Sequence, residues 1–135
     1  MAHVLDGYDG LCSNMHGHSY ILSVTVIGLP IQQKGHPKLG MVMDFGDLKR
    51  IVNPLIVTRF DHAVSVMENT PMHKRLVDAQ FARVEVLPFQ PTCENMLEYF
   101  AEIISAQLPA GVSLHHLKMH ETATSYAEWY ASDNS

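Results

Sequence analysis

The segment covering residues 16–28 constrains the fold of this chain more than any other. It opens with His16-Gly17-His18 and continues over residues 21–28 as an alternating run rich in β-branched residues, which predicts a strand. Side chains on a strand alternate between its faces, so both imidazoles are expected on one face, with Cα atoms about 7 Å apart. The same face would carry a buried layer formed by Tyr20, Leu22, Val24 and Val26. The pattern predicts two neighbouring imidazoles at the mouth of a core.

Two imidazoles at this spacing suit a single metal ion. Zinc in a catalytic site takes three protein ligands and keeps a fourth position open, so a third ligand is needed. His3 is the nearest candidate, and Cys12, four residues before His16, would be a base and nucleophile if held as thiolate. The residues alone also allow these histidines to have roles that involve no metal. A His-x-His pair is often an exposed or hydrogen-bonded pair on a strand, and His3 would then be a disordered terminal residue.

Composition excludes several classes of protein. The chain has 135 residues, 47% hydrophobic and 17% charged, which predicts one folded domain. No apolar run approaches the roughly 18 to 20 residues of a membrane helix and no signal peptide is recognisable, so we expect a cytoplasmic protein without a membrane partner. The formal net charge of −5, with only nine Lys and Arg, argues against a nucleic-acid partner. Cys12 and Cys93 form no disulfide framework.

After the first strand, the sequence predicts a loop, a second strand and a helix. Residues 29–39 read as a polar loop, and residues 41–45 read as a second strand, antiparallel to the first through a hairpin-like connection. A helix is expected to begin at Asp44 and to end near Arg59. Pro54 should kink or interrupt this helix, because proline lacks an N–H donor. The apolar stripe of the helix comprises Leu48, Ile51, Val52, Leu55 and Ile56.

The middle of the chain is the least regular part. Residues 68–71 indicate a turn, and residues 72–80 are expected to form a short helix. Residues 82–87 alternate and predict a brief strand or extended segment.

The last third predicts a helix followed by strands. Thr92 is the expected N-cap of a helix that ends at residues 109–111. Residues 112–121 predict a strand, whose alternation places on one side Leu117, Met119 and Glu121. Residues 126–131 predict the last strand. This order of elements predicts an α+β fold, with two helices packed on one face of an antiparallel sheet.

Several short motifs, in order along the chain, resemble those of one family. They are Ala2-His3, Cys12 with three residues before His16-Gly17-His18, Gly40-Met41-Val42-Met43-Asp44-Phe45, Asp61-His62, Pro91-Thr92-Cys93-Glu94-Asn95 and Glu121-Thr122. The set resembles the 6-pyruvoyl-tetrahydropterin synthase superfamily. Within it, the three-residue gap after Cys12 is similar to the bacterial 6-carboxy-tetrahydropterin synthases of queuosine biosynthesis, whereas the animal enzymes have a longer gap. The resemblance implies the tunnelling fold (T-fold).

The resemblance also implies roles for individual residues. It implies Zn²⁺ held by three metal ligands, His3, His16 and His18. Cys12 would be the catalytic thiolate that takes a proton from the substrate side chain, and Asp61 with His62 would be the acid/base pair. Glu121 would anchor the pterin ring, since a carboxylate has two acceptor oxygens for the ring's N–H donors. Without the resemblance, Asp61-His62 would be a surface pair and Glu121 an exposed glutamate at a strand end.

The implied activity is a zinc-dependent lyase reaction on a small pterin triphosphate. It converts 7,8-dihydroneopterin triphosphate to 6-carboxy-5,6,7,8-tetrahydropterin, with release of acetaldehyde and triphosphate. The alternatives are a 6-pyruvoyl-type triphosphate lyase using the same residues and a non-catalytic pterin- or metal-binding relative. The resemblance further implies a homo-oligomer, a trimer or a hexamer, with active sites between subunits.

The chain departs from the family pattern at two places. Members usually have a further strand before the Ala-His element, so this chain is expected to lack the family's first strand within its single domain, residues 1–135. The loss would leave a sheet edge unpaired and His3 on a loose terminus. Residues 64–90 form a long segment before the helix start at Thr92, and the resemblance supplies no function for them.

Overall fold

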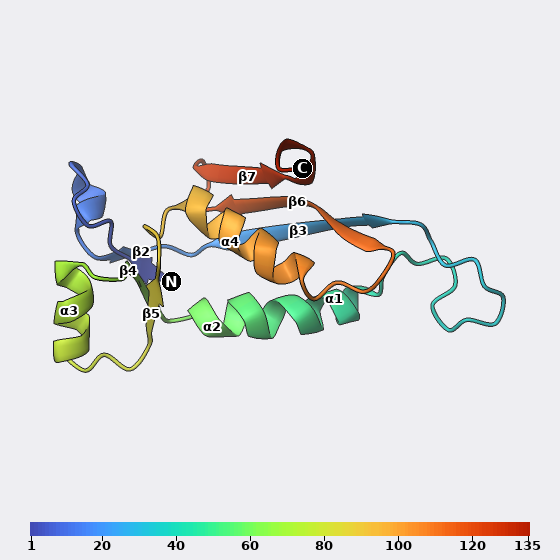
Figure 1. Ribbon diagram of the computed structural model, residues 1–135, viewed down its shortest axis with the longest axis horizontal. Coiled ribbons are helices and arrows are strands. Elements are labelled where there is room, and N and C mark those ends of the chain that lie inside the picture. The colour runs from blue at the N-terminus through green and yellow to red at the C-terminus, as the bar shows by residue number, and fades with distance from the viewer.

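A three-stranded antiparallel sheet in the order β3-β6-β7 carries most of the core in the computed structural model, which describes residues 1–135 (Figure 1). The strands are β3 (Ile21–Gly28), β6 (Val112–His120) and β7 (Tyr126–Tyr130), each within one residue of its predicted bounds. Along β3, the side chains of Leu22 and Val24 pack on the core, while the odd-numbered positions face away from it. The predicted strand over residues 21–28 is therefore confirmed, with Leu22 and Val24 on its buried face, whereas His16 lies outside it, in a strand of a second sheet.

Strand β6 contains a β-bulge opposite the middle of β3. Thr25 pairs with His116 but Val26 pairs with Leu114, so His115 is an extra residue without a partner. The bulge allows Leu114 and Leu117, three residues apart, both to face the core, with exposures of 5% and 0%. Strict alternation would have placed them on opposite faces.

One continuous helical stretch runs from the end of the long loop to the turn at Asp61. It consists of α1 (Phe45–Val52), the π-helical turn η2 (Asn53–Val57) and α2 (Thr58–Phe60). The Asp44 carboxylate accepts a hydrogen bond from the Gly46 N–H at 2.7 Å, which confirms the predicted helix start. Pro54 cannot donate a hydrogen bond, and the wider π turn accommodates it without ending the helix.

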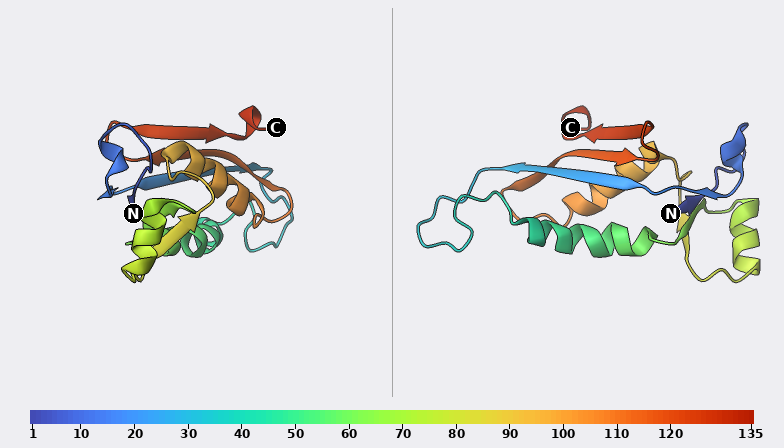
Figure 2. Two further views of the ribbon diagram at one scale, coloured as in Figure 1. Left: turned by 60° about the vertical axis from the view of Figure 1, so that its left-hand side comes forward. Right: turned by 180° about the vertical axis from the view of Figure 1, so that it is seen from behind.

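The second major helix, α4 (Cys93–Ser105), lies beside the first on the same face of the sheet (Figure 2). The Thr92 hydroxyl accepts a hydrogen bond from the Asn95 N–H at 3.3 Å, as the sequence predicts. Thirteen buried residues join both helices to the sheet, and the rings of Phe60 and Phe100 meet edge to face at 5.4 Å. The expected α+β fold, with two helices packed on one face of an antiparallel sheet, is confirmed.

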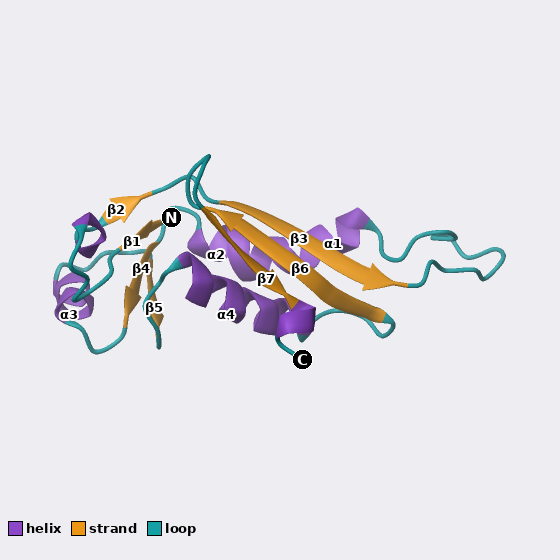
Figure 3. Cartoon of the chain, turned by 90° about the horizontal axis from the view of Figure 1, so that it is seen from above, coloured by secondary structure: helices purple, strands orange, loops and turns teal.

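A second, smaller sheet, which the sequence did not indicate, lies at the end of the molecule where β3 begins and β6 ends (Figure 3). Its strands, in the order β2-β1-β4-β5, are β1 (Ala2–His3), β2 (His16–Gly17), β4 (Val64–Met67) and β5 (Val84–Leu87). β1 pairs antiparallel with β2 and parallel with β4, so the first residues of the chain lie between two neighbours. This sheet brings His3 opposite His16.

The segment between the two major helices supports this second sheet. Helix α3 (Pro71–Asp78) connects the parallel strands β4 and β5, with Thr70 as its N-cap. Val66 and Leu76 form a small separate core with Val4. Residues 64–87 therefore hold the strand that carries His3. No helix of the protein combines the length and apolar character needed to cross a membrane.

Two expectations about local structure are wrong. Residues 41–45 form no strand: after two backbone hydrogen bonds between Ile31 and residues 40–41, the chain turns directly into the cap at Asp44. His3 does not lie on a loose terminus, because it is 2% exposed and held in β1. Residues 41–45 have no partner strand, whereas His3 is held by pairing of β1 with β2 and β4, and local sequence pattern encodes neither.

The Leu117→Ala variant should lose about 3 kcal/mol of unfolding free energy, because Leu117 is fully buried between the sheet and both helices. Urea unfolding of the metal-free protein at one fixed protein concentration measures this loss. Val77→Ala on α3 is the matched control, since Val77 is 59% exposed and its truncation should change stability by less than about 0.5 kcal/mol. Equal stabilities of the two variants would contradict the packing described.

Candidate functional site

Three histidines and one glutamate meet where the two sheets adjoin. His3 comes from β1, His16 from β2, His18 from the link between β2 and β3, and Glu121 from the end of β6. One ligand atom from each side chain lies within 4.8 Å of the others. The fold thus unites residues separated by more than one hundred positions. Three of them are the predicted metal ligands, and the fourth is the predicted pterin anchor.

Backbone carbonyls orient two of the imidazoles. His3 Nδ1 lies 2.8 Å from the carbonyl oxygen of Pro91, and His16 Nδ1 lies 2.7 Å from that of Asn14. A carbonyl only accepts, so each Nδ1 must carry the proton and donate it. Each Nε2 is then left with a lone pair, and the two Nε2 atoms lie 2.9 Å apart. This arrangement is typical of histidines that bind a metal.

The remaining contacts also fit a metal. His18 Nε2 lies 2.8 Å from Glu121 Oε1, yet it is buried and has no partner in hydrogen-bond geometry. Tetrahedral zinc with bonds of 2.0–2.1 Å places its ligand atoms about 3.3 Å apart. His3–His16, His18–Glu121 and His3–Glu121 have separations of 2.9, 2.8 and 3.5 Å, and all four ligand atoms lie within 4.8 Å of one another. Burial lowers the pKa of His3, which favours the neutral imidazole that a metal requires. These four residues are therefore suited to hold a zinc ion.

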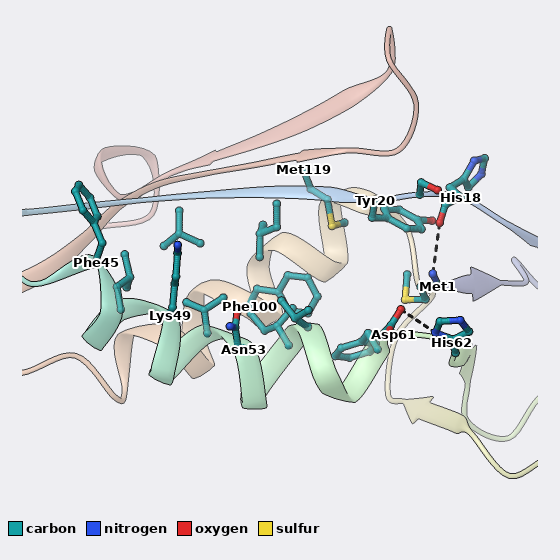
Figure 4. A pocket seen from close by; sticks show the side chains of 18 residues that line it. Met1, His18, Tyr20, Phe45, Lys49, Asn53, Asp61, His62, Phe100 and Met119 are labelled. Atoms are coloured by element: carbon teal, nitrogen blue, oxygen red, sulfur yellow. Dashed lines mark hydrogen bonds and ion pairs between the residues drawn. The ribbon is translucent and has the colours of Figure 1, made fainter.

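A groove of about 980 Å³ begins beside this cluster and runs between β3 and the α1–α2 helix (Figure 4). Its polar end contains His18 and Tyr20 on one wall and Asp61 and His62 on the other. The rest is mostly apolar, and its lining includes Leu22, Val24, Phe45, Leu48, Val52 and Ile56. A small polar molecule at the first end would contact the histidine cluster and the Asp61-His62 pair together.

Asp61 and His62 occupy a sharp turn after α2. His62 has φ +58°, and its Nδ1 lies 3.0 Å from Asp61 Oδ1, so the chain makes the turn that this pair needs. The Arg83 guanidinium donates to the carbonyl oxygens of Thr58 and Asp61 at 2.7 and 3.0 Å. These bonds satisfy carbonyls at the helix end that have no partner within it. The side chains of Asp61 and His62 are 65% and 85% exposed, so both remain accessible from the groove.

Cys12 stands apart from the groove. It lies in the 3₁₀ turn η1 (Leu11–Ser13), is partly buried, and is a free cysteine. Its backbone carbonyl accepts a hydrogen bond from the Leu5 N–H at 3.0 Å, which ties the turn to the strand carrying His3. The side chain is neither among the groove-lining residues nor in the histidine cluster. Its catalytic role stays a prediction.

Two further side chains belong to the site, and sequence reasoning assigned neither to it. The Tyr20 hydroxyl lies 3.3 Å from His3 Nδ1; burial, and then the charge of Glu121, raise the pKa of this phenol well above its usual range. The Cys93 thiol donates to Glu121 Oε2 at 3.7 Å. In the sequence, Tyr20 continues the strand pattern after His18, which indicates a core residue, and Cys93 is expected to have a structural role. Only the three-dimensional structure shows that both side chains contact the cluster.

The two cysteines should differ sharply in reactivity at pH 8. Burial, followed by the nearby Glu121 carboxylate, raises the pKa of Cys93 to about 12, so about one molecule in ten thousand carries that thiolate at pH 8. Cys93 is also only 7% exposed. We expect iodoacetamide to label Cys12 in the folded protein and Cys93 only after denaturation, as mapped by peptide mass spectrometry. Equal labelling of both thiols in the folded state would contradict the burial of Cys93.

Comparison with known proteins identifies relatives over nearly the whole chain. The family model described as 6-pyruvoyl tetrahydropterin synthase matches residues 1–132. The 6-carboxy-5,6,7,8-tetrahydropterin synthase of Haemophilus influenzae is 33% identical over 132 residues, which cover 96% of this chain and 91% of that protein.

Solved structures share the fold. The 6-pyruvoyl tetrahydropterin synthase of Caenorhabditis elegans superimposes with a TM-score of 0.66 at 23% identity, covering 96% of this chain and 87% of that one. An uncharacterized protein from Wolinella succinogenes gives a TM-score of 0.78 at 18% identity, covering 96% and 92%.

Proposed function

Because the chain belongs to the 6-pyruvoyl tetrahydropterin synthase family, we propose that it is a zinc-dependent lyase of pterin metabolism. Its reaction converts 7,8-dihydroneopterin triphosphate to 6-carboxy-5,6,7,8-tetrahydropterin, with release of acetaldehyde and triphosphate, and belongs to queuosine biosynthesis. The observation that carries this proposal is the meeting of His3, His16, His18 and Glu121 beside a groove whose opposite wall bears Asp61 and His62. A zinc ion bound there would act as a Lewis acid toward oxygens of the substrate side chain.

The groove offers a place for the pterin and the first part of its side chain. The polar end is bordered by Tyr20, His18 and His62, and would take the pterin and the first atoms of its side chain. Glu121 would accept hydrogen bonds from the 2-amino group and the ring N–H of the pterin.

Proton transfer is assigned to three residues. Cys12 takes a proton from the substrate side chain as thiolate, and His62 moves protons with Asp61 beside its Nδ1. The Asp61 carboxylate, 3.0 Å from His62 Nδ1, would orient the imidazole for this transfer. Since Cys12 stands apart from the groove, the proposal includes a homo-oligomer in which neighbouring chains complete the site. The edges of β3 and β7 that have no partner strand within the chain support such pairing.

The choice between two products rests on sequence. The 33% identical Haemophilus influenzae relative is a 6-carboxy enzyme, and three residues separate Cys12 from His16 as in the bacterial branch. The family description itself names the 6-pyruvoyl activity, which is the second candidate. The same residues would serve either reaction.

Product analysis tests the proposal. The zinc-loaded protein is incubated with 7,8-dihydroneopterin triphosphate, and the products are identified by mass spectrometry. We expect 6-carboxy-tetrahydropterin with acetaldehyde, and a 6-pyruvoyl product would move the protein to the second candidate. Cys12→Ala serves as the matched control, since it should lose most turnover while keeping its zinc. Absence of turnover in the wild-type protein would refute the lyase proposal and favour a non-catalytic pterin- or metal-binding relative.

A further inference from the structure

The link between α2 and β4 carries the candidate acid/base pair and consists of only three residues, Asp61, His62 and Ala63. His62 has φ +58°, a left-handed conformation that is unfavourable for most residues with a Cβ atom and persists only where surrounding contacts hold it. Ala63 is 2% exposed, and its carbonyl oxygen accepts a hydrogen bond from the Ala2 N–H at 2.9 Å. These contacts fix the end of the link, whereas its beginning, where Asp61 leaves α2, needs a contact of its own.

Arg83 supplies that contact. Its guanidinium donates from Nε to the Asp61 carbonyl oxygen at 3.0 Å, and from one terminal nitrogen to the carbonyl oxygens of Thr58 and Arg59 at 2.7 and 3.4 Å. The planar guanidinium presents its donors in a fixed arrangement, so it sets the Asp61 carbonyl relative to the last turn of α2. That carbonyl belongs to the peptide group that joins Asp61 to His62. Its direction therefore helps to determine where the His62 side chain points.

Strand β5 brings Arg83 to the end of α2 (Figure 1). Arg83 directly precedes this strand, and its own carbonyl oxygen accepts a hydrogen bond from the Val64 N–H at 2.9 Å. Two residues further along, the Glu85 carboxylate accepts a hydrogen bond from Arg59 Nε at 2.9 Å, so a second contact joins β5 to the same helix end. Residues 64–90, for which the family resemblance supplies no function, therefore contact the segment that carries the acid/base pair.

We propose that Arg83 is a positioning residue, whose guanidinium holds the turn at Asp61 and His62 so that both side chains face the polar end of the groove. The kinetic consequence rests on the proposed function, in which this pair moves protons. Arg83 does not line the groove, and it donates only to backbone carbonyl oxygens, so it acts through the turn and not on the substrate. Proton transfer needs donor and acceptor within about 3 Å of each other, and a displacement of about 1 Å can cost roughly a hundredfold in rate.

Steady-state kinetics of zinc-saturated Arg83→Met tests the role in catalysis. Methionine keeps a long apolar side chain but has no donor, so kcat should fall by about 10- to 100-fold while KM and zinc affinity stay within about twofold of the wild type. Arg83→Lys should fall between the two, because a single ammonium cannot reproduce the planar arrangement of donors. Arg75→Met on α3 is the matched control, since Arg75 is exposed and makes no side-chain hydrogen bond, and it should leave kcat unchanged.

Two kinetic outcomes would contradict the positioning role. One is a wild-type kcat in Arg83→Met, or a loss of the same size in Arg75→Met, which would assign the effect to charge alone. The other is a loss of zinc affinity in step with kcat, because the change would then act through the histidine cluster and not through the turn.

Histidine NMR tests the position of His62 without any turnover. In ¹H–¹³C spectra of the zinc-loaded protein, the imidazole signal of His62 is identified by its absence in His62→Asn. We expect this signal to shift in Arg83→Met and to stay in place in Arg75→Met, while the signals of the histidine cluster stay in place in both. An unshifted His62 signal in Arg83→Met would overturn the positioning role. If the wild type lacks turnover, the proposed function fails, and the His62 signal still decides whether Arg83 holds the turn.

Discussion

Replacing His16 with alanine should weaken zinc binding by on the order of a hundred- to a thousandfold. Structural zinc sites with four ligands contribute roughly 10–16 kcal/mol, or about 3–4 kcal/mol for each ligand, and about 1.4 kcal/mol corresponds to a tenfold change in affinity. His16 is oriented by the Asn14 carbonyl, so its ring is ready to bind before any metal arrives. Competition with a chromogenic chelator at pH 7.5 measures the loss. Turnover should fall with zinc occupancy.

The matched control for His16→Ala is His115→Ala. His115 is the extra residue of the β6 bulge, is exposed, and makes no side-chain hydrogen bond, so this variant should bind zinc like the wild type. A His16→Ala protein that keeps wild-type zinc affinity would show that the cluster is not the metal site. Unfolding curves of both metal-free variants check that neither change acts through the fold.

His62→Asn should lower kcat by about 10²- to 10⁴-fold while zinc binding and stability stay close to wild type. General acid–base catalysis supplies accelerations of this size. Asparagine is a better replacement than alanine for this test, because His62 has φ +58° and asparagine tolerates the left-handed conformation. The side chain is 85% exposed, so its loss should change unfolding free energy by less than about 0.5 kcal/mol. Steady-state kinetics with zinc-saturated protein measures the effect.

Asp61→Asn separates the two members of the pair. The amide keeps an oxygen near His62 Nδ1 but loses the negative charge beside the imidazole, so kcat should fall while zinc affinity stays close to that of the wild type. A His62→Asn variant with wild-type kcat would remove the pair from the mechanism. If Asp61→Asn alone lost activity, the carboxylate would act on the substrate directly.

Much of the larger sheet and its helices could be predicted because local chemistry specifies them. Alternation over residues 21–28 defines β3, and the caps Asp44 and Thr92 mark both helix starts, since their side chains satisfy backbone N–H groups nearby in sequence. Pro54 was correctly expected to disturb its helix. The π turn that accommodates it depends on the packing of Val52 and Ile56 against the core, which extends the helix past the proline.

The second sheet could not be predicted from local pattern. Strand β1 has two residues and β4 has four, too few to show a period. Their order depends on parallel pairing between segments more than sixty residues apart, and loop closure over that distance leaves no local signal. For the same reason, residues 41–45, which look like a strand, form none: no partner strand is positioned beside them.

Sequence alone determined the residue types of the candidate site: the His-Gly-His spacing, His3, Asp61-His62 and Glu121 are all readable in order along the chain. Only the tertiary structure decided which of them meet. β1 has to lie between β2 and β4 before His3 can approach His16, and β6 has to end beside β3 before Glu121 can reach His18. Ligand chemistry is a property of each side chain, but a shared site needs atoms within a few ångströms, and only long-range strand pairing sets that distance.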